Sequence, residues 1–181
     1  MQKSILQQIL SKAAQMKGTQ LLVFILIILL AVFSCTQPKG EGFAIYLLTR
    51  DIPISEMPVI SHLKLADKPI ISLRDIVSYS KQTHEIELTE DAYRRISELE
   101  IPMSGKVFVV SVDRRPIYWG AFWAPISSMS FEGVTIRKPL TSAQYIIQLE
   151  LGYPSSDFFT GNDPRSNITI LKSLEQAGKL Q

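Results

Sequence analysis

Hydrophobic positions are most densely patterned between Gly105 and Trp123, in the segment GKVFVVSVDRRPIYWGAFW. Residues 106–112 form a nearly continuous apolar run of strand length, and residues 117–123 contain four aromatic side chains. The polar residues between them, 113–116, have the composition of a turn. The segment therefore predicts a β-hairpin. Because the first strand is apolar on both faces, we expect it to be central in a sheet that helices cover.

Further strands are predicted on both sides of this hairpin. An apolar run predicts one over 43–49, and strict alternation predicts one over 84–88, with Glu85 and Glu87 on its solvated face. A third is predicted over 134–138, after a turn at 131–133. The prolines within 52–69 predict extended segments or loops that wrap the domain.

Helices are predicted where a capping residue precedes apolar residues at helical spacing. The expected helices cover about 73–80 after Ser72, the segment from Thr89 to about Leu99, the segment from Thr141 to about Leu151, and the segment from Ser166 or Asn167 to Gly178. Together with the strands, they predict an α+β fold. Its mixed or antiparallel sheet has a central hairpin, with helices packed on one face.

A separate hydrophobic block lies near the start of the chain. Residues 1–20 carry three lysines and no acid, 21–33 are thirteen consecutive apolar residues, and Ser34 and Cys35 follow. This composition is typical of a secretory signal, whereas a membrane span needs about 20 apolar residues. The segment Val32-Phe33-Ser34-Cys35 resembles a bacterial lipoprotein signal, which would make Cys35, the only cysteine, the lipid attachment site.

Two other interpretations of this block remain open. It could be an uncleaved signal-anchor helix whose short span is relieved by bilayer thinning, or a core helix of a soluble protein with Cys35 as a buried thiol. Contact with the membrane would be through lipidated Cys35 or the 21–34 apolar segment. Because all three lysines precede the block, either membrane interpretation places the rest of the chain on the extracytoplasmic side of the cell membrane.

The predicted organisation is a signal peptide or anchor over 1–34, a flexible linker over 35–42 and a single domain over 43–181. The whole chain has 19 Lys and Arg against 17 Asp and Glu, and three of these cations lie in the leader, so the rest carries a net charge of −1. The domain therefore lacks the basic excess typical of nucleic-acid binding. Without a second cysteine it must be stabilised by its core rather than by disulfides.

No sequence motif specific to catalysis is present, and the two histidines, His62 and His84, are isolated, so neither metal nor cofactor is predicted. Arg114 and Arg115 could form an anion site at the hairpin tip, although a turn with exposed cations explains them equally well. A hydrolase is the alternative to a binding domain. Its site would lie near Asp113 and the 153–165 loop, where Asp157 or Asp163 would need to converge with hydroxyl groups.

The aromatic strand also supplies a candidate binding patch. Trp119 and Trp123 share one strand face, and Tyr118 and Phe122 share the other. One face should be core, which leaves the other as a candidate patch, and the adjacent aromatics of the 153–165 loop could join it or dock onto the domain. The candidate partner-binding residues are Tyr118, Trp119, Phe122, Trp123, Phe158 and Phe159.

The order of these elements and their motifs resembles the extracytoplasmic head domain of the bacterial protein-export subunit SecD, over about 70–154. The motifs are Glu87-Leu88-Thr89 followed by Ala92, Gly105-Lys106 before the 107–113 strand, Pro125-Ile126, and Leu151-Gly152-Tyr153-Pro154. The turn differs, with Asp113-Arg114 where SecD typically has Asp-Gly, and no six-span membrane domain follows. The resemblance implies an α+β head that contacts polypeptides or a membrane complex, and not the export activity. We therefore expect a membrane-anchored binding domain rather than an enzyme.

Overall fold

The computed structural model of the chain describes residues 40–140 and 144–181. The predicted signal or anchor and the predicted lipid attachment site at Cys35 therefore lie outside the described residues. Residues 40–181 form one compact unit. Within the described ranges, no helix has both the length and the apolar character needed to cross a membrane.

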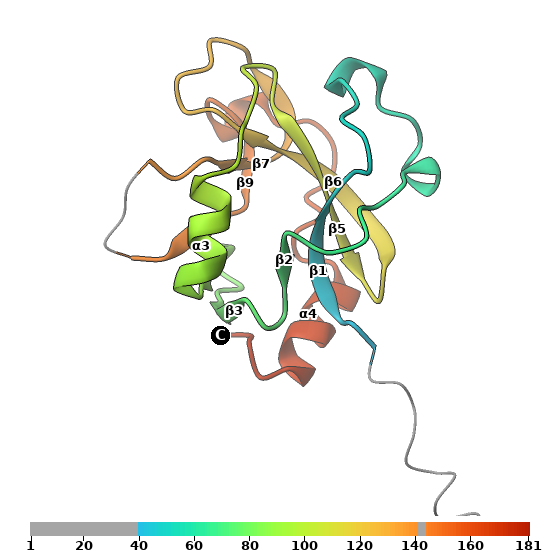
Figure 1. Cartoon of the computed structure of the whole chain (residues 1–181), viewed down its shortest axis with the longest axis vertical. Coiled ribbons are helices and arrows are strands. Elements are labelled where there is room, and N and C mark those ends of the chain that lie inside the picture. Colours follow the sequence, from blue (N-terminus) through green and yellow to red (C-terminus); the bar gives the residue numbers. More distant parts are fainter. Residues whose placement is uncertain (1–39, 141–143) are drawn as a thin grey trace, which may run out of the picture. The chain divides into compact units, whose positions relative to one another are not determined.

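The larger of two sheets has six strands in the order β2-β1-β5-β6-β7-β9 (Figure 1). These strands are β1 (Phe43–Leu47), β2 (Ile71–Ser72), β5 (Lys106–Val112), β6 (Arg115–Trp123), β7 (Phe131–Arg137) and β9 (Glu150–Tyr153). Neighbouring strands are antiparallel except for β6 and β7, which run parallel. The predicted α+β class with a mixed sheet is therefore confirmed.

The predicted hairpin is confirmed as β5 and β6 at the centre of this sheet. Asp113 and Arg114 form its two-residue turn, with φ of 52° and 60°. Positive φ at both positions is typical of a type I′ turn, whose twist matches that of the flanking strands. The Asp113 carboxylate accepts a hydrogen bond of 2.8 Å from the backbone N–H of Gly42, which fixes the start of β1 beside the turn.

A second sheet has three strands in the order β3-β4-β8, namely β3 (Ile76–Tyr79), β4 (Glu85–Leu88) and β8 (Ile146–Gln148). The two α-helices within the described ranges, α3 (Glu90–Ser97) and α4 (Ile168–Gln176), begin at predicted caps: Thr89 accepts from the N–H of Ala92, and Asn167 from that of Thr169. Three short 3₁₀ helices complete the described elements: η1 (Ile54–Glu56), η2 (Ile60–His62) and η3 (Ser156–Phe158).

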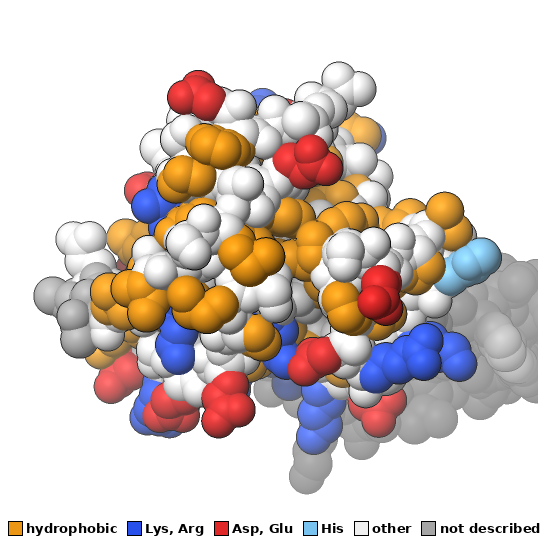
Figure 2. Space-filling model, turned by 90° about the horizontal axis from the view of Figure 1, so that it is seen from above, with side chains coloured by type: hydrophobic (Ala, Val, Ile, Leu, Met, Phe, Trp, Pro, Cys, Tyr) orange, Lys and Arg blue, Asp and Glu red, His pale blue; other side chains and the backbone are white. Residues whose placement is uncertain are grey.

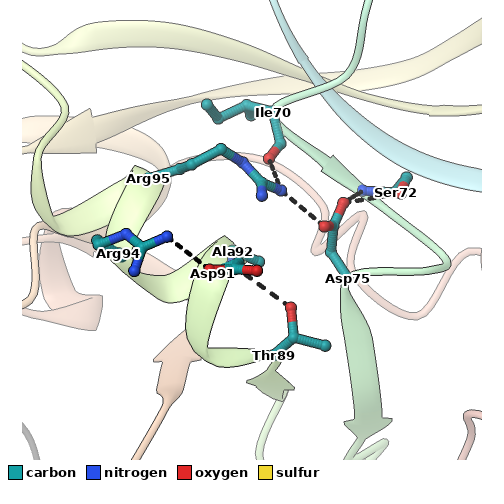
Figure 3. A network of polar contacts seen from close by, with 8 residues as sticks. All are labelled: Ile70, Ser72, Asp75, Thr89, Asp91, Ala92, Arg94 and Arg95. Carbon is teal, nitrogen blue, oxygen red and sulfur yellow. Dashed lines mark hydrogen bonds and ion pairs between the residues drawn. The ribbon is translucent and has the colours of Figure 1, made fainter.

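The helix predicted over 73–80 is wrong, because the segment forms a turn and strand β3. The half of a capping box that Asp75 supplies does form, since its carboxylate accepts from the N–H and Oγ of Ser72 at 2.8 and 2.7 Å (Figure 3). Arg95 of α3 also donates to Asp75 at 2.6 Å. The turn does not propagate, because the β-branched residues that follow pair with β4 instead.

The helix predicted over 141–151 is also wrong in its described part, which forms β8 and β9. The β-branched pair Ile146 and Ile147 extends along β4, and residues 150–153 pair with β7. The turn predicted at 131–133 is wrong as well, since Phe131 lies in β7 and pairs with Tyr153 across an irregular register. In each case sheet pairing with a distant strand outweighs the local helix or turn signal.

Both faces of the central hairpin are buried. The face that carries Phe108 and Phe122 packs in the main apolar cluster, to which the small sheet and both helices contribute. The opposite face, which carries Val109 and Trp123, packs in two smaller clusters with residues of the 52–65 segment and with Phe131 and its aromatic neighbours. The segment predicted to wrap the domain therefore covers the second face of the sheet.

Candidate binding surface

The structure places three of the six residues of the predicted aromatic patch in the core. Tyr118 and Phe122 are buried in the main cluster, and Trp123 is only 1% exposed. The predicted patch is therefore wrong for these three residues, because the sheet is covered on both faces. Trp119 is half-buried at the rim of the second face. In the 153–165 loop, Phe158 is exposed and Phe159 is half-buried.

The hairpin tip does not present two free cations. The Arg114 guanidinium lies over the Tyr46 ring, 5.0 Å from its centroid, and donates to the backbone carbonyl of Asp67 at 3.0 Å. This side chain therefore connects the tip to the 66–67 segment, while Arg115 is exposed. Burial and a hydrogen bond to Glu41 raise the pKa of Tyr46 to about 12. Of the two arginines of the predicted anion site, Arg114 is therefore engaged in these contacts and Arg115 is exposed. One exposed arginine does not form a binding site by itself.

The acidic residues of the hydrolase alternative are engaged in separate local interactions. Asp157 accepts from the Ser155 hydroxyl at 3.3 Å, and Asp163 pairs with Arg165 through two hydrogen bonds of 2.9 and 2.7 Å. Among the residues that the structure describes, no three His, Cys, Asp or Glu side chains are grouped as a metal site requires. Asp157 therefore meets one hydroxyl group, on the exposed surface of the loop, while Asp163 is engaged by Arg165.

A buried polar pair lies between the two sheets. The Tyr79 hydroxyl and the His84 Nδ1 are 2.9 Å apart, and both side chains are buried. Burial lowers the pKa of His84, and the nearby positive charge of Arg165 lowers it further, against the opposing effect of Asp163. Burial thus favours the neutral imidazole in the folded domain, and the pair provides a hydrogen bond in its interior.

A different surface emerges at one end of the large sheet, where β1 ends, β5 begins and β6 ends. The connections that leave these strands are joined by hydrogen bonds: Ser127 Oγ donates to the Met103 carbonyl at 2.7 Å, and the Tyr153 hydroxyl donates to the Pro125 carbonyl at 2.9 Å. They lie at the top of Figure 1, whereas the chain enters β1 from below. Hydrogen bonds therefore hold these loops against one another.

The segments that connect the strands expose several large apolar side chains. We name as the loop surface Val59, Met103, Ile126, Met129 and Phe158. Ile126 is 80% exposed and is the most exposed large apolar residue within the described ranges. Figure 2 views this end of the domain and shows hydrophobic side chains spread across it, with charged groups mostly toward the margins. The sequence pattern does not reveal this surface, because its residues come from separate irregular segments, and only Phe158 and the Pro125-Ile126 motif stand out among them.

Comparison of the chain with protein-family models, with curated proteins and with solved structures found no match.

Proposed function

We propose that the chain is a membrane-tethered, extracytoplasmic domain whose loop surface binds another polypeptide. The observation that carries this proposal is the gathering of exposed apolar side chains on loops that hydrogen bonds hold in place. Exposed apolar patches of this kind mark interaction sites, and methionine side chains adapt readily to different apolar partners. The resemblance to the SecD head supports the same class of partner.

The tether in this proposal is lipidated Cys35 or, alternatively, an uncleaved 21–34 anchor. Its support is the basic, apolar and small-residue order of the leader. Within the domain, Gly40 lies next to the Asp113 turn, at the end of the sheet opposite the loop surface. The described part of the linker therefore joins the domain at the end of the sheet opposite the loop surface.

Substitution of the loop surface should abolish this binding. We expect the triple variant Met103→Gln, Ile126→Gln, Met129→Gln to bind a reduced and alkylated, permanently unfolded polypeptide at least tenfold more weakly than the wild type does. The reason is the loss of apolar contact area, at about 25 cal/mol per Å². Because all three side chains are exposed, folding should be nearly unchanged. Fluorescence anisotropy with the full chain in nanodiscs of zwitterionic lipid measures the affinity.

The matched control is Val77→Gln with Ile168→Gln, which removes two exposed apolar side chains outside the loop surface. This control should bind the probe as the wild type does. Equal affinity of the wild type and the triple variant, or equal losses in the triple variant and the control, would contradict the loop surface as the binding site.

Lipidation of Cys35 is tested in bacterial cells that express the full chain. Metabolic labelling with a radioactive fatty acid should label the wild type and leave the Cys35→Ser variant unlabelled, because the thiol is the attachment point. Absence of label from the wild type would contradict the lipoprotein proposal. Membrane fractionation of the same cells then distinguishes an uncleaved anchor, which keeps the chain in the membrane, from a soluble protein.

A further inference from the structure

A pocket of about 300 Å³ opens beside the end of β1. Its two sides are held together by an antiparallel bridge between Leu48 and Leu65 and by a hydrogen bond of 2.9 Å from the Thr49 N–H to the Lys64 carbonyl. Leu48 and Ile52 belong to the apolar cluster that also contains Val109, so the pocket lies against a firmly packed core. The residues that line it are Leu48, Thr49, Arg50, Ile52, Pro58, His62 and Lys64.

The titratable side chains that line this pocket are all basic. Arg50, His62 and Lys64 are exposed, and their side chains make no hydrogen bond or ion pair with any residue that the structure describes. None of the lining residues is acidic. The acid next in sequence, Asp51, is already paired with Lys106 through contacts of 2.7 and 2.8 Å. A positive rim therefore borders an aliphatic interior.

We propose that this pocket binds a carboxylate that is joined to a short aliphatic chain. A guanidinium and an ammonium group form strong, charge-assisted hydrogen bonds to a carboxylate, and the aliphatic interior accepts the hydrocarbon part. At about 30 Å³ for each water-sized group, the volume accommodates roughly ten non-hydrogen atoms. Two sources share this chemistry, the C-terminal residue of an apolar polypeptide and a short fatty acid. The proposal for the pocket does not depend on the loop surface, because no residue that lines the pocket belongs to that surface.

The test uses the full chain in nanodiscs of zwitterionic lipid, with isotopic labels on the isoleucine and leucine methyl groups. The probes are N-acetyl-leucine, 4-methylpentanoate and the neutral analogue N-acetyl-leucinamide. We expect both acids to shift the Ile52 methyl signal saturably, and the amide to bind at least tenfold more weakly. The double variant Arg50→Gln, Lys64→Gln should weaken binding of the acids at least tenfold, because it removes both rim charges.

A matched control removes one arginine and one lysine elsewhere, in the variant Arg74→Gln, Lys172→Gln. Both residues are exposed and without a partner among the described residues, so this control should bind the acids as the wild type does. Tighter binding of N-acetyl-leucine identifies a polypeptide C-terminus as the source, and tighter binding of 4-methylpentanoate identifies a fatty acid. The proposal is overturned if neither acid shifts the signal, if the amide binds equally well, or if the Arg50 and Lys64 variant binds undiminished.

Discussion

Replacing Trp123 with alanine should lower the free energy of unfolding by about 3–5 kcal/mol, as expected for a large aromatic side chain deleted from a core. Trp123 is 1% exposed, and its ring stacks on Phe131 with centroids 5.2 Å apart and an interplanar angle of 13°. The ring also contacts Tyr153, at a centroid distance of 5.7 Å. Its removal would leave a cavity that these two rings cannot readily fill.

Trp119 provides the matched comparison, because it lies four residues earlier on the same strand face and undergoes the same chemical change. It is half-buried and loses less contact, so Trp119→Ala should cost clearly less than Trp123→Ala in urea unfolding. The variant Trp123→Phe should fall between them, since it keeps a ring and removes an Nε1 donor that has no partner within the described residues. Similar losses for the two alanine variants would contradict the assignment of Trp123 to the core.

The hairpin and the capped helices could be predicted because their signals are local. A dense apolar run, an Asp-containing turn and a second run specify β5 and β6, and Thr89 and Asn167 specify helix starts through hydrogen bonds within three residues. The two wrong helices show where local signals fail. The Asp75 carboxylate accepts from Ser72 as in a capping box, yet the residues after it pair with β4, and the apolar spacing over 73–80 does not reveal that pairing.

The candidate site could not be predicted for a related reason. Whether an aromatic residue of β6 is exposed depends on what covers each face of the sheet. Ile54 packs against the cluster that contains Trp123, and it comes from a proline-rich segment that carries no regular periodicity. The pocket depends on the pairing of Leu48 with Leu65, across an irregular loop. The loop surface requires the three strand ends to be brought together. Each feature arises from contacts between segments that are distant in sequence.

Replacing Gly152 with alanine should lower the free energy of unfolding by about 2–5 kcal/mol, the sum of backbone strain and steric overlap. Gly152 has φ of 70°, and an added Cβ would lie 2.6 Å from the Ser155 carbonyl oxygen and 2.8 Å from the Phe159 nitrogen. Because both neighbours are backbone atoms, no side-chain rotation relieves the overlap. The turn that carries Phe158 would have to move away from β9.

Gly178→Ala separates the two contributions, because Gly178 has φ of 67° but no atom within 4 Å of an added Cβ. Its cost should be about 1 kcal/mol, from backbone strain alone. Urea unfolding of both variants measures the difference, and equal costs would show that residues 155–159 do not pack against β9 as described. Because Phe158 belongs to the loop surface, Gly152→Ala should also weaken binding of the unfolded polypeptide, whereas Gly178→Ala should leave it unchanged. A side chain at position 152 should thus affect both the stability of β9 at the edge of the sheet and the shape of the proposed binding surface.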